Sequence, residues 1–514
     1  MARLVNRLFG KGSKASTRPS STDDDRNAPT SQSGALPKIT GFERPLEERY
    51  VQALLTNTFG QTYYTSQKEL IAQGEVLHEE MLAADPAFMA RALVYARNKG
   101  FMRTQPIFGM STLASSEKGG AALDEAFGRV VLTPNDLGDF TTLVKSKGHG
   151  EGGRRVKRIA GNWLLSNLSE YWAIKYGAQR AEGYSIADMF KVYHPKAGKR
   201  LPIVDYVLGK DADLSSLPQI AAFERLKRAD RDEDKIKAIT DGRLPHEVAT
   251  PFAGSSKGVW QAIVPNMPVM ALLKNLATLE RHEVLESSKE IVLKKLTNAE
   301  SIEKSKILPF RFVEARQHVR TPWLQKALAD ALDLAFANVP DIPGRTAVFL
   351  DRSGSMNSLI RTAAIFGVCV MKKARNNGRF MLFDDQLEEV EVDLKGSVLA
   401  QAERIHARGG TTTSLPMEQL TRDRDKVDNI VLITDEQQNQ GSPFQKVLDD
   451  YRRRVNEDAK CFILDLSPYQ NALVPTSDDK TFYVYGWSDQ ALSFVSMASQ
   501  GWGTFVDVVR HGSL

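Results

Sequence analysis

The stretch Arg345–Met356, RTAVFLDRSGSM, decides the fold of the C-terminal part of this 514-residue chain. Its apolar run Ala347–Leu350 predicts a buried parallel strand that ends on Asp351. The turn Ser353–Ser355 and a helical pattern follow, and such units place ligands at the carboxyl ends of their strands. One carboxylate and two hydroxyls are hard oxygen donors, which suit Mg²⁺. The competing interpretation is that Asp351 only caps the next helix.

Residues 345–514 alternate between short apolar runs and helical patterns. This alternation predicts a doubly wound, Rossmann-like α/β domain. The predicted strands are Ala347–Leu350, Arg379–Phe383, Val390–Val392, Asn429–Ile433, Cys461–Leu466 and Phe482–Val484. The predicted helices are Leu359–Arg375, Ser397–His406, Phe444–Val455 and Gln490–Met497.

Residues 42–340 have helical periodicity in almost every segment and no convincing strand. Separators such as Asp85-Pro86 and Thr133-Pro134 divide the helical runs. Many helices joined by short turns are typical of an α-solenoid, so we expect a helical array as the first of two large domains. The segment Pro340–Gly344 is interpreted as the linker between them.

The N-terminal residues 1–41 are rich in Ser, Thr, Pro and Gly, and predict a disordered basic tail. The first dozen residues also faintly resemble an organelle presequence, although the acidic cluster Asp23–Asp25 follows soon after. No run of eighteen apolar residues occurs, so we expect no membrane span. Cys369 and Cys461 lie inside apolar segments and are expected to be core thiols in a reducing, cytoplasmic compartment.

The net charge of +5 is unevenly distributed along the chain. Between Lys145 and Arg200 there are twelve Lys and Arg residues against four Asp and Glu. From Arg345 to the end there are twenty against twenty-three. We therefore expect an anionic partner to bind the first of these segments.

Two clusters of that segment are candidate contacts for RNA or another polyanion. In the first, Arg154 and Arg158 project from the face opposite the apolar stripe that includes Val156 and Ala160. The second surrounds Tyr193, an aromatic that could stack on an exposed base. A merely solvated face is the competing interpretation, and His194 alone is a weak indicator. The candidates are Arg154, Arg155, Lys157, Arg158, Lys191, His194, Lys196, Lys199 and Arg200.

A cation bound by Asp351, Ser353 and Ser355 would need more oxygen ligands from the same domain. The glycine-backed loop 409–413 can bring a threonine hydroxyl near the strand ends, and Asn429–Ile433 is followed by Thr434 and Asp435. The order D-x-S-x-S, G-G-T and T-D resembles the metal-ion-dependent adhesion site of von Willebrand factor A domains. On that resemblance, the ligands of Mg²⁺ would be Asp351, Ser353, Ser355, Thr411 and Asp435.

With this domain assigned, the chain resembles the Ro autoantigen family from about Phe42 to its end. The segments that carry the resemblance are Gly153–Ala160, Phe190–Lys196 and Pro265–Leu276. The resemblance implies a TROVE module, a ring of HEAT-like helical repeats closed by the A domain. It also implies that small non-coding Y RNA binds on a basic outer surface and that single-stranded ends of misfolded RNA enter a central hole. The chain departs from the family at Thr412, where an acidic residue is common.

Three classes of function are compatible with these features. The leading one is a non-catalytic RNA-binding scaffold or chaperone, a monomeric ring that works with an exoribonuclease as some bacterial relatives do. The alternative is a protein-interaction module that captures an acidic partner at its metal. A Mg²⁺ phosphohydrolase is disfavoured because Ser353 stands where a second acid would be needed.

Overall fold

The computed structural model describes residues 45–56, 67–100, 102–150, 152–177, 183–375, 377–435, 440–465, 473, 478, 480–485, 489–499 and 502–512. The predicted tail of residues 1–41 lies outside this part of the chain. None of the helices in the described part is long and apolar enough to cross a membrane.

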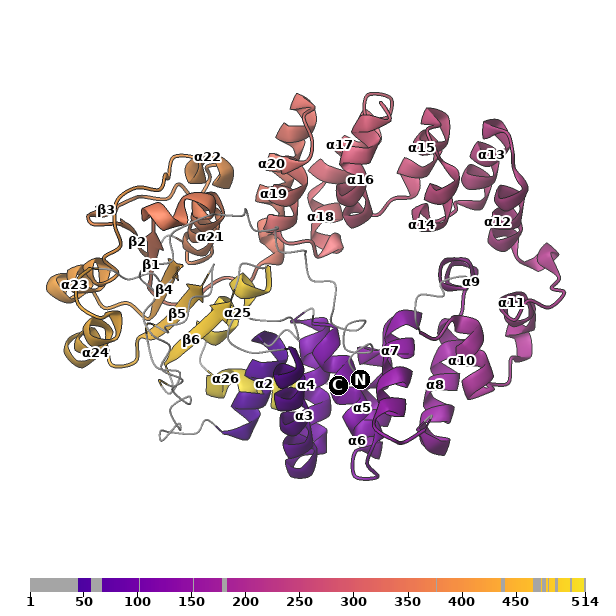
Figure 1. Ribbon diagram of the computed structural model, residues 1–514, viewed down its shortest axis with the longest axis horizontal. Coiled ribbons are helices and arrows are strands. Elements are labelled where there is room, and N and C mark those ends of the chain that lie inside the picture. The colour runs from indigo at the N-terminus through magenta and orange to yellow at the C-terminus, as the bar shows by residue number, and fades with distance from the viewer. Residues whose placement is uncertain are drawn as a thin grey trace, which may run out of the picture.

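Up to residue 340 the described chain is helical and contains no strand, as predicted. Two rows of helices curve around the molecule (Figure 1). The first row comprises α2 (Leu46–Thr56), α3 (Gln67–Ala84), α4 (Pro86–Asn98), α5 (Thr104–Ala114), α6 (Gly120–Val130), α7 (Pro134–Ser146), α8 (Gly153–Asn167), α9 (Glu170–Tyr176), α10 (Ile186–Tyr193) and α11 (Leu201–Val207). The second comprises α12 (Pro218–Arg228), α13 (Asp232–Gly242), α14 (His246–Ala249), α15 (Lys257–Ile263), α16 (Val269–Arg281), α17 (Lys289–Thr297), α18 (Ala299–Ser305), α19 (Pro309–Gln317) and α20 (Pro322–Ala335).

The proline separators begin helices for a local chemical reason. Asp85 precedes Pro86 and accepts a hydrogen bond of 2.8 Å from the backbone N–H of Phe88, which caps α4. Thr133 and Asp136 form a capping box around Pro134 at the start of α7. These boundaries could be predicted because capping is set by neighbouring residues alone.

The C-terminal sheet has six strands in the order β3-β2-β1-β4-β5-β6. Their bounds are β1 Thr346–Asp351, β2 Gly378–Phe383, β3 Leu387–Glu389, β4 Asn429–Thr434, β5 Lys460–Asp465 and β6 Thr481–Tyr485. All neighbours are parallel except β2 and β3. The helices of this region are α21 (Ile360–Lys373), α22 (Val398–Ala402), α23 (Ser414–Asp423), α24 (Phe444–Arg454), α25 (Asp489–Ser499) and α26 (Trp502–His511).

The doubly wound α/β prediction is confirmed, with three local differences. The third strand lies at Leu387–Glu389 instead of Val390–Val392, because a tight turn at Asp384 fixes where the antiparallel pairing begins. The helix predicted at Ser397–His406 is shorter, ending at Ala402. Two helices, α23 and α26, were not predicted.

The predicted linker Pro340–Gly344 is held against the α/β domain. Ile342 is buried, and its backbone N–H donates to the carbonyl of Lys373 at 2.9 Å. Across the same junction the rings of Phe310 in α19 and Phe366 in α21 stack at 5.7 Å. One continuous hydrophobic core therefore runs from the helical array into the α/β domain.

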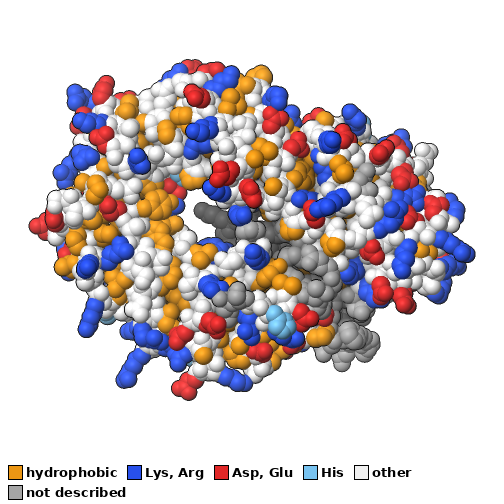
Figure 2. Space-filling model, turned by 180° about the vertical axis from the view of Figure 1, so that it is seen from behind, with side chains coloured by type: hydrophobic (Ala, Val, Ile, Leu, Met, Phe, Trp, Pro, Cys, Tyr) orange, Lys and Arg blue, Asp and Glu red, His pale blue; other side chains and the backbone are white. Residues whose placement is uncertain are grey.

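The C-terminal helices return to the first helices and close the molecule into a ring (Figure 1). Helix α26 packs on α2 and α4, and α25 packs on α2. Arg510 forms an ion pair of 3.3 Å with Glu47, and its guanidinium lies 5.8 Å from the ring centre of Phe88. Figure 2 shows a hollow near the middle of this ring.

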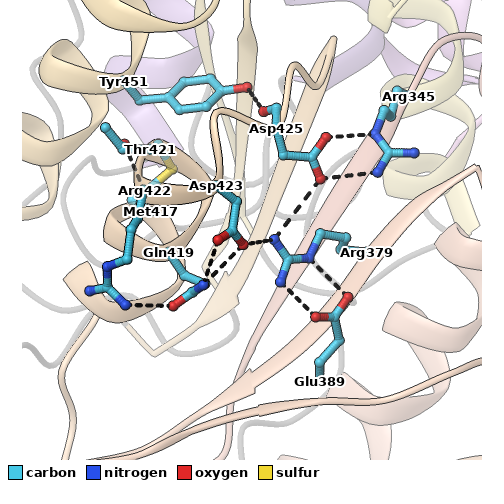
Figure 3. A network of polar contacts seen from close by, with 10 residues as sticks. All are labelled: Arg345, Arg379, Glu389, Met417, Gln419, Thr421, Arg422, Asp423, Asp425 and Tyr451. Carbon is cyan, nitrogen blue, oxygen red and sulfur yellow. Dashed lines mark hydrogen bonds and ion pairs between the residues drawn. The ribbon is translucent and has the colours of Figure 1, made fainter.

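The amino end of the sheet is held by a network of ion pairs (Figure 3). Arg345 pairs with both oxygens of Asp425, at 2.8 and 3.0 Å. Arg379 binds Glu389 through two hydrogen bonds and Asp423 through one of 2.7 Å. The Tyr451 hydroxyl donates to the Asp425 carbonyl at 2.7 Å. These contacts join β1, β2 and β3 to the loop that precedes β4.

His78 makes the stability of the first helices sensitive to acid. Its ring is buried between the Tyr50 hydroxyl and Gln105, at 2.9 and 3.1 Å, and burial lowers its pKa to about 3. Because the unfolded histidine titrates near 6.5, the stabilisation by neutral His78 is present above that pH and is lost as pH falls. We expect a loss of about 2 kcal/mol at pH 5. His78→Gln should lower stability at pH 7.5 but remove this pH dependence in denaturant titrations, and an unchanged dependence would contradict it.

Candidate functional site

The carboxyl end of the sheet brings the predicted metal ligands together. The chain passes from β1 to β2 on one side and later to β4 on the other, so the edge between β1 and β4 is the switch point where such sheets bind ligands. Asp351 ends β1 and Asp435 follows β4 directly. Their exposed fractions are 0% and 2%. Two buried carboxylates therefore lie at this switch point, as predicted.

Hydrogen bonds fix the Asp351 carboxylate. One oxygen accepts from the Thr434 hydroxyl at 2.7 Å, and the other accepts from the backbone N–H of Ser353 at 2.9 Å. Burial raises the pKa of Asp351 to about 6, and the nearby charge of Asp435 adds to this rise against the hydrogen bonds, which lower it. A cation at this position would offset the unfavourable free energy of burying two negative charges.

The hydroxyl donors lie on the adjacent loops. The Ser353 and Ser355 hydroxyl oxygens are 3.1 Å apart. The backbone N–H of Gly354 donates to the carbonyl of Gly409 at 3.1 Å, which holds the glycine loop and buried Thr411 beside the serines. Gly409 has φ +72°, so glycine suits this turn. In the part of the chain that the structure describes, no three His, Cys, Asp or Glu side chains form a metal-binding group, so a metal here would depend on hydroxyls.

Sequence analysis missed two cations behind these loops, the buried Arg352 and the exposed Arg408. Arg352, inside the D-R-S-G-S motif, and Arg408 each donate to one oxygen of Asp384 at 2.8 Å. Burial alone would raise the pKa of Asp384, but the hydrogen bond from Arg408 and those from its other neighbours bring it below its ordinary value. The available signal in the sequence was the position of Arg352 between Asp351 and Ser353, two of the predicted metal ligands. Because Arg352 and Arg408 both bind Asp384, this carboxylate joins the loop of Ser353 to the loop of Thr411.

The predicted apolar face of α8 is confirmed, with Val156, Ala160, Trp163 and Leu164 buried. Arg154, Arg155 and Arg158 are exposed, as predicted. Asp124 of α6 lies 3.2 Å from Arg158 and 3.9 Å from Arg155, so two of these cations are partly neutralised. Lys157 is half-buried and has an interaction of its own.

The second predicted cluster begins in α10 and continues beyond it, and Tyr193 does not have the exposed ring that was predicted. Tyr193 is only 5% exposed, and its hydroxyl is 2.5 Å from that of Thr141, so it has no free face for a base. The apolar face of α10 must be buried for the helix to pack, and Tyr193 belongs to it. Arg200 is exposed but donates to the carbonyl of Leu168 at 2.9 Å. The exposed side chains here are Lys191, His194, Lys196, Lys199 and Arg200.

The two clusters are neighbours in space. Helix α10 packs on α8, and a Cβ on Gly161 would lie 3.3 Å from Pro195. Within the described chain, the side chains of Arg154, Lys191, Lys196 and Lys199 have no ion pair or hydrogen bond. Lys and Arg side chains gather along the lower left rim in Figure 2. Because this view is turned by 180°, that rim corresponds to α8, α10 and α11 at the lower right of Figure 1.

These features define the class of the protein, a helical ring that is joined to a doubly wound α/β domain and has a cationic rim. Residues 247–448 match the TROVE domain. The chain is 24% identical over 497 residues to the RNA-binding protein RO60 of Deinococcus radiodurans, covering 88% of this chain and 93% of that protein. It is 26% identical over 363 residues to the RNA-binding protein RO60 of Caenorhabditis elegans, covering 65% of this chain and 56% of that one.

The crystal structure of the Deinococcus radiodurans Ro protein (RSR) has the same fold. It superposes with a TM-score of 0.75 at 21% identity and covers 89% of this chain and 100% of that one. These matches show that the chain is similar to members of the Ro autoantigen family. The TROVE match crosses from α14 into α24, which agrees with the continuous core between the two domains.

The buried charge of Asp351 should destabilise the metal-free protein at neutral pH. Because its folded pKa is about 6 and its ordinary value 3.8, the folded state holds the proton more tightly, and stability falls as pH rises from about 4 to about 6. Asp351→Asn keeps the acceptor for Ser353, and the Thr434 hydroxyl can turn to accept from the new amide. In EDTA at pH 7.5 we expect this variant to be more stable than the wild type, by up to about 3 kcal/mol.

Calorimetry at pH 4.5 and 7.5 measures this difference. The two proteins should be close in stability at the lower pH, where the wild-type carboxyl is protonated. A variant that is less stable than the wild type at pH 7.5 would show that the Asp351 charge is compensated within the chain.

Proposed function

We propose that this protein is an RNA-binding protein of the Ro type, with no catalytic activity of its own. The observation that carries the proposal is the group of four uncommitted cations, Arg154, Lys191, Lys196 and Lys199, on adjacent parts of a rigid helical array. Lys and Arg on such a scaffold match the spacing of phosphate oxygens, and their affinity for RNA falls as salt competes. The two relatives named RNA-binding protein RO60 support it.

The finer proposal follows the family resemblance. The outer basic surface would bind structured small non-coding RNA of the Y type, and the central hollow would admit single-stranded ends of misfolded RNA. The helical array would be a set of HEAT-like repeats, and the protein a monomeric ring in the cytoplasm with an exoribonuclease as a possible partner. The ring closure through α25 and α26 supports a ring formed by one chain.

We also propose that the α/β domain is a von Willebrand factor A domain whose adhesion site holds Mg²⁺. Asp351, Ser353, Ser355, Thr411 and Asp435 would be the ligands, directly or through water. The raised pKa of Asp351 and the contact between the two serine hydroxyls support a cation at this position. The bound ion would offer open coordination positions to a carboxylate. A Mg²⁺-dependent scaffold that captures an acidic protein is therefore the second candidate function.

Removing uncommitted cations should weaken RNA binding and its salt dependence. In the double variant Arg154→Ala/Lys196→Ala, the slope of log affinity against log salt should become shallower by about 2. Lys304→Ala/Lys326→Ala is the matched control, because it removes two exposed cations that pair with acids elsewhere on the ring. Fluorescence anisotropy with a structured RNA at several salt concentrations measures both. Equal slopes in the two variants would remove this rim from the RNA site.

Magnesium should stabilise the protein in a pH-dependent way. Protons compete with the metal for Asp351, whose pKa is about 6, so the rise in melting temperature with excess MgCl₂ should be larger at pH 7.5 than at pH 5. Asp351→Asn should abolish the rise and leave RNA affinity within a few-fold. A variant that still responds to MgCl₂ would place the metal elsewhere. If RNA binding collapses in the folded variant, the two sites are coupled.

A further inference from the structure

The surface beside α10 contains a shallow depression of about 330 Å³, lined by Gly183, Tyr184, Asp188, Lys191 and Val192. We propose that this depression is a subsite for one unpaired nucleotide of bound RNA. Its base would stack on the ring of Tyr184, and its phosphate would pair with Lys191. The inference rests on the proposed RNA-binding function and deepens it by naming the kind of nucleotide that is bound.

The polar ends of the two residues that would bind the nucleotide have no partner among the described residues, while the half-buried side chain of Tyr184 also packs against the core. In the described chain the Lys191 ammonium has no ion pair or hydrogen bond, and neither does the Tyr184 hydroxyl. Nearby polar groups are committed: the Tyr193 hydroxyl contacts Thr141, and Arg158 pairs with Asp124. An aromatic ring and a free cation that line one depression are the two elements that single-stranded RNA sites combine.

The walls of the depression are fixed before any ligand binds. Ser185 and Asp188 form a capping box, in which the Ser185 N–H and hydroxyl both donate to Asp188, at 3.0 and 2.7 Å. Tyr184 directly precedes this cap, and its backbone lies against α7, where a Cβ on Gly138 would be 3.5 Å from the Tyr184 carbonyl oxygen. Lys191 follows Asp188 by about one helical turn. A nucleotide would therefore bind with little ordering of the protein.

Charge and size distinguish among anionic ligands. The single negative charge of Asp188 and the single positive charge of Lys191 cancel along the lining, which disfavours a phosphate buried in the depression. This balance of charges favours a neutral base inside the depression and one phosphodiester group at Lys191. A volume of about 330 Å³ is at the small end for ligand sites, so it suits one nucleotide. The bases of a duplex are stacked and paired, so they cannot reach Tyr184.

The test compares Tyr184→Ala and Tyr184→Phe on a short single-stranded RNA and on a blunt duplex of the same composition. Tyr184→Ala should weaken single-strand binding about 10-fold and change duplex binding less than about 2-fold, since stacking involves only unpaired bases. Tyr184→Phe keeps the ring and should bind like the wild type. Lys191→Met should make the salt slope for the single strand shallower by about 1. Tyr171→Ala, at a tyrosine 37% exposed on α9, is the control for the loss of an aromatic ring elsewhere, and it should leave binding of both RNAs unchanged.

Several outcomes would overturn the subsite. If the wild type binds RNA and Tyr184→Ala binds the single strand equally well, the depression is not part of the RNA site and the proposed function still stands. Equal losses on strand and duplex would exclude base stacking as the cause. A free mononucleotide that binds as tightly as the strand would assign the depression to a small molecule. A wild type that binds neither RNA would overturn the subsite together with the proposed function.

Discussion

The contact between the two ends of the described chain is the constraint on which the rest of the structure depends. In a helical array each helix touches mainly its neighbours, so small rotations add up and nothing within the array fixes the distance between its ends. Here α25 and α26, which follow the last strand, pack on α2 and α4. Phe494, Val495 and Val509 are buried in the same core as Tyr50 and Leu54. This apolar contact closes the ring and fixes the size of its central hollow.

The carboxylates at the two ends of the sheet have different partners. At the amino end, Arg345 and Arg379 form ion pairs with Asp425, Glu389 and Asp423, which hold the loop before β4 in place (Figure 3). At the carboxyl end, Asp351 and Asp435 are buried close together, and the pKa of Asp351 rises as a result. The guanidinium of Arg352, the residue that follows Asp351, donates to Asp384 instead. Guanidiniums thus hold the carboxylates at the amino end, whereas hydrogen bonds hold the Asp351 carboxylate at the carboxyl end.

The cations of the basic segment 145–200 fall into two groups, those that bind other parts of the protein and those that are exposed without a partner among the described residues. Arg155 and Arg158 share Asp124, and Arg200 donates to a backbone carbonyl, so these cations stabilise contacts between helices. Lys191, in the last turn of α10, and Lys196, just after this helix, are exposed and have no partner in the described chain. The local excess of positive charge is therefore smaller on the surface than in the sequence. It is concentrated where α8 and α10 meet, beside the depression at Tyr184.

The sequence by itself determined the features that depend on neighbouring residues. These include the capped helix starts at Asp85 and Thr133, the buried strands that end on Asp351 and Thr434, and the order of the motifs that resemble a metal site. The tertiary structure decided what depends on residues far apart in the chain: the ring closure by the unpredicted α26, and the register of β3. It also decided the burial of Tyr193, because only the packing of α7 against α10 shows that its hydroxyl meets Thr141. Local sequence patterns cannot show which charged residues form ion pairs, because the partners lie far apart in the chain. Asp124 is in α6 and Arg158 in α8, while Arg352 follows β1 and Asp384 follows β2.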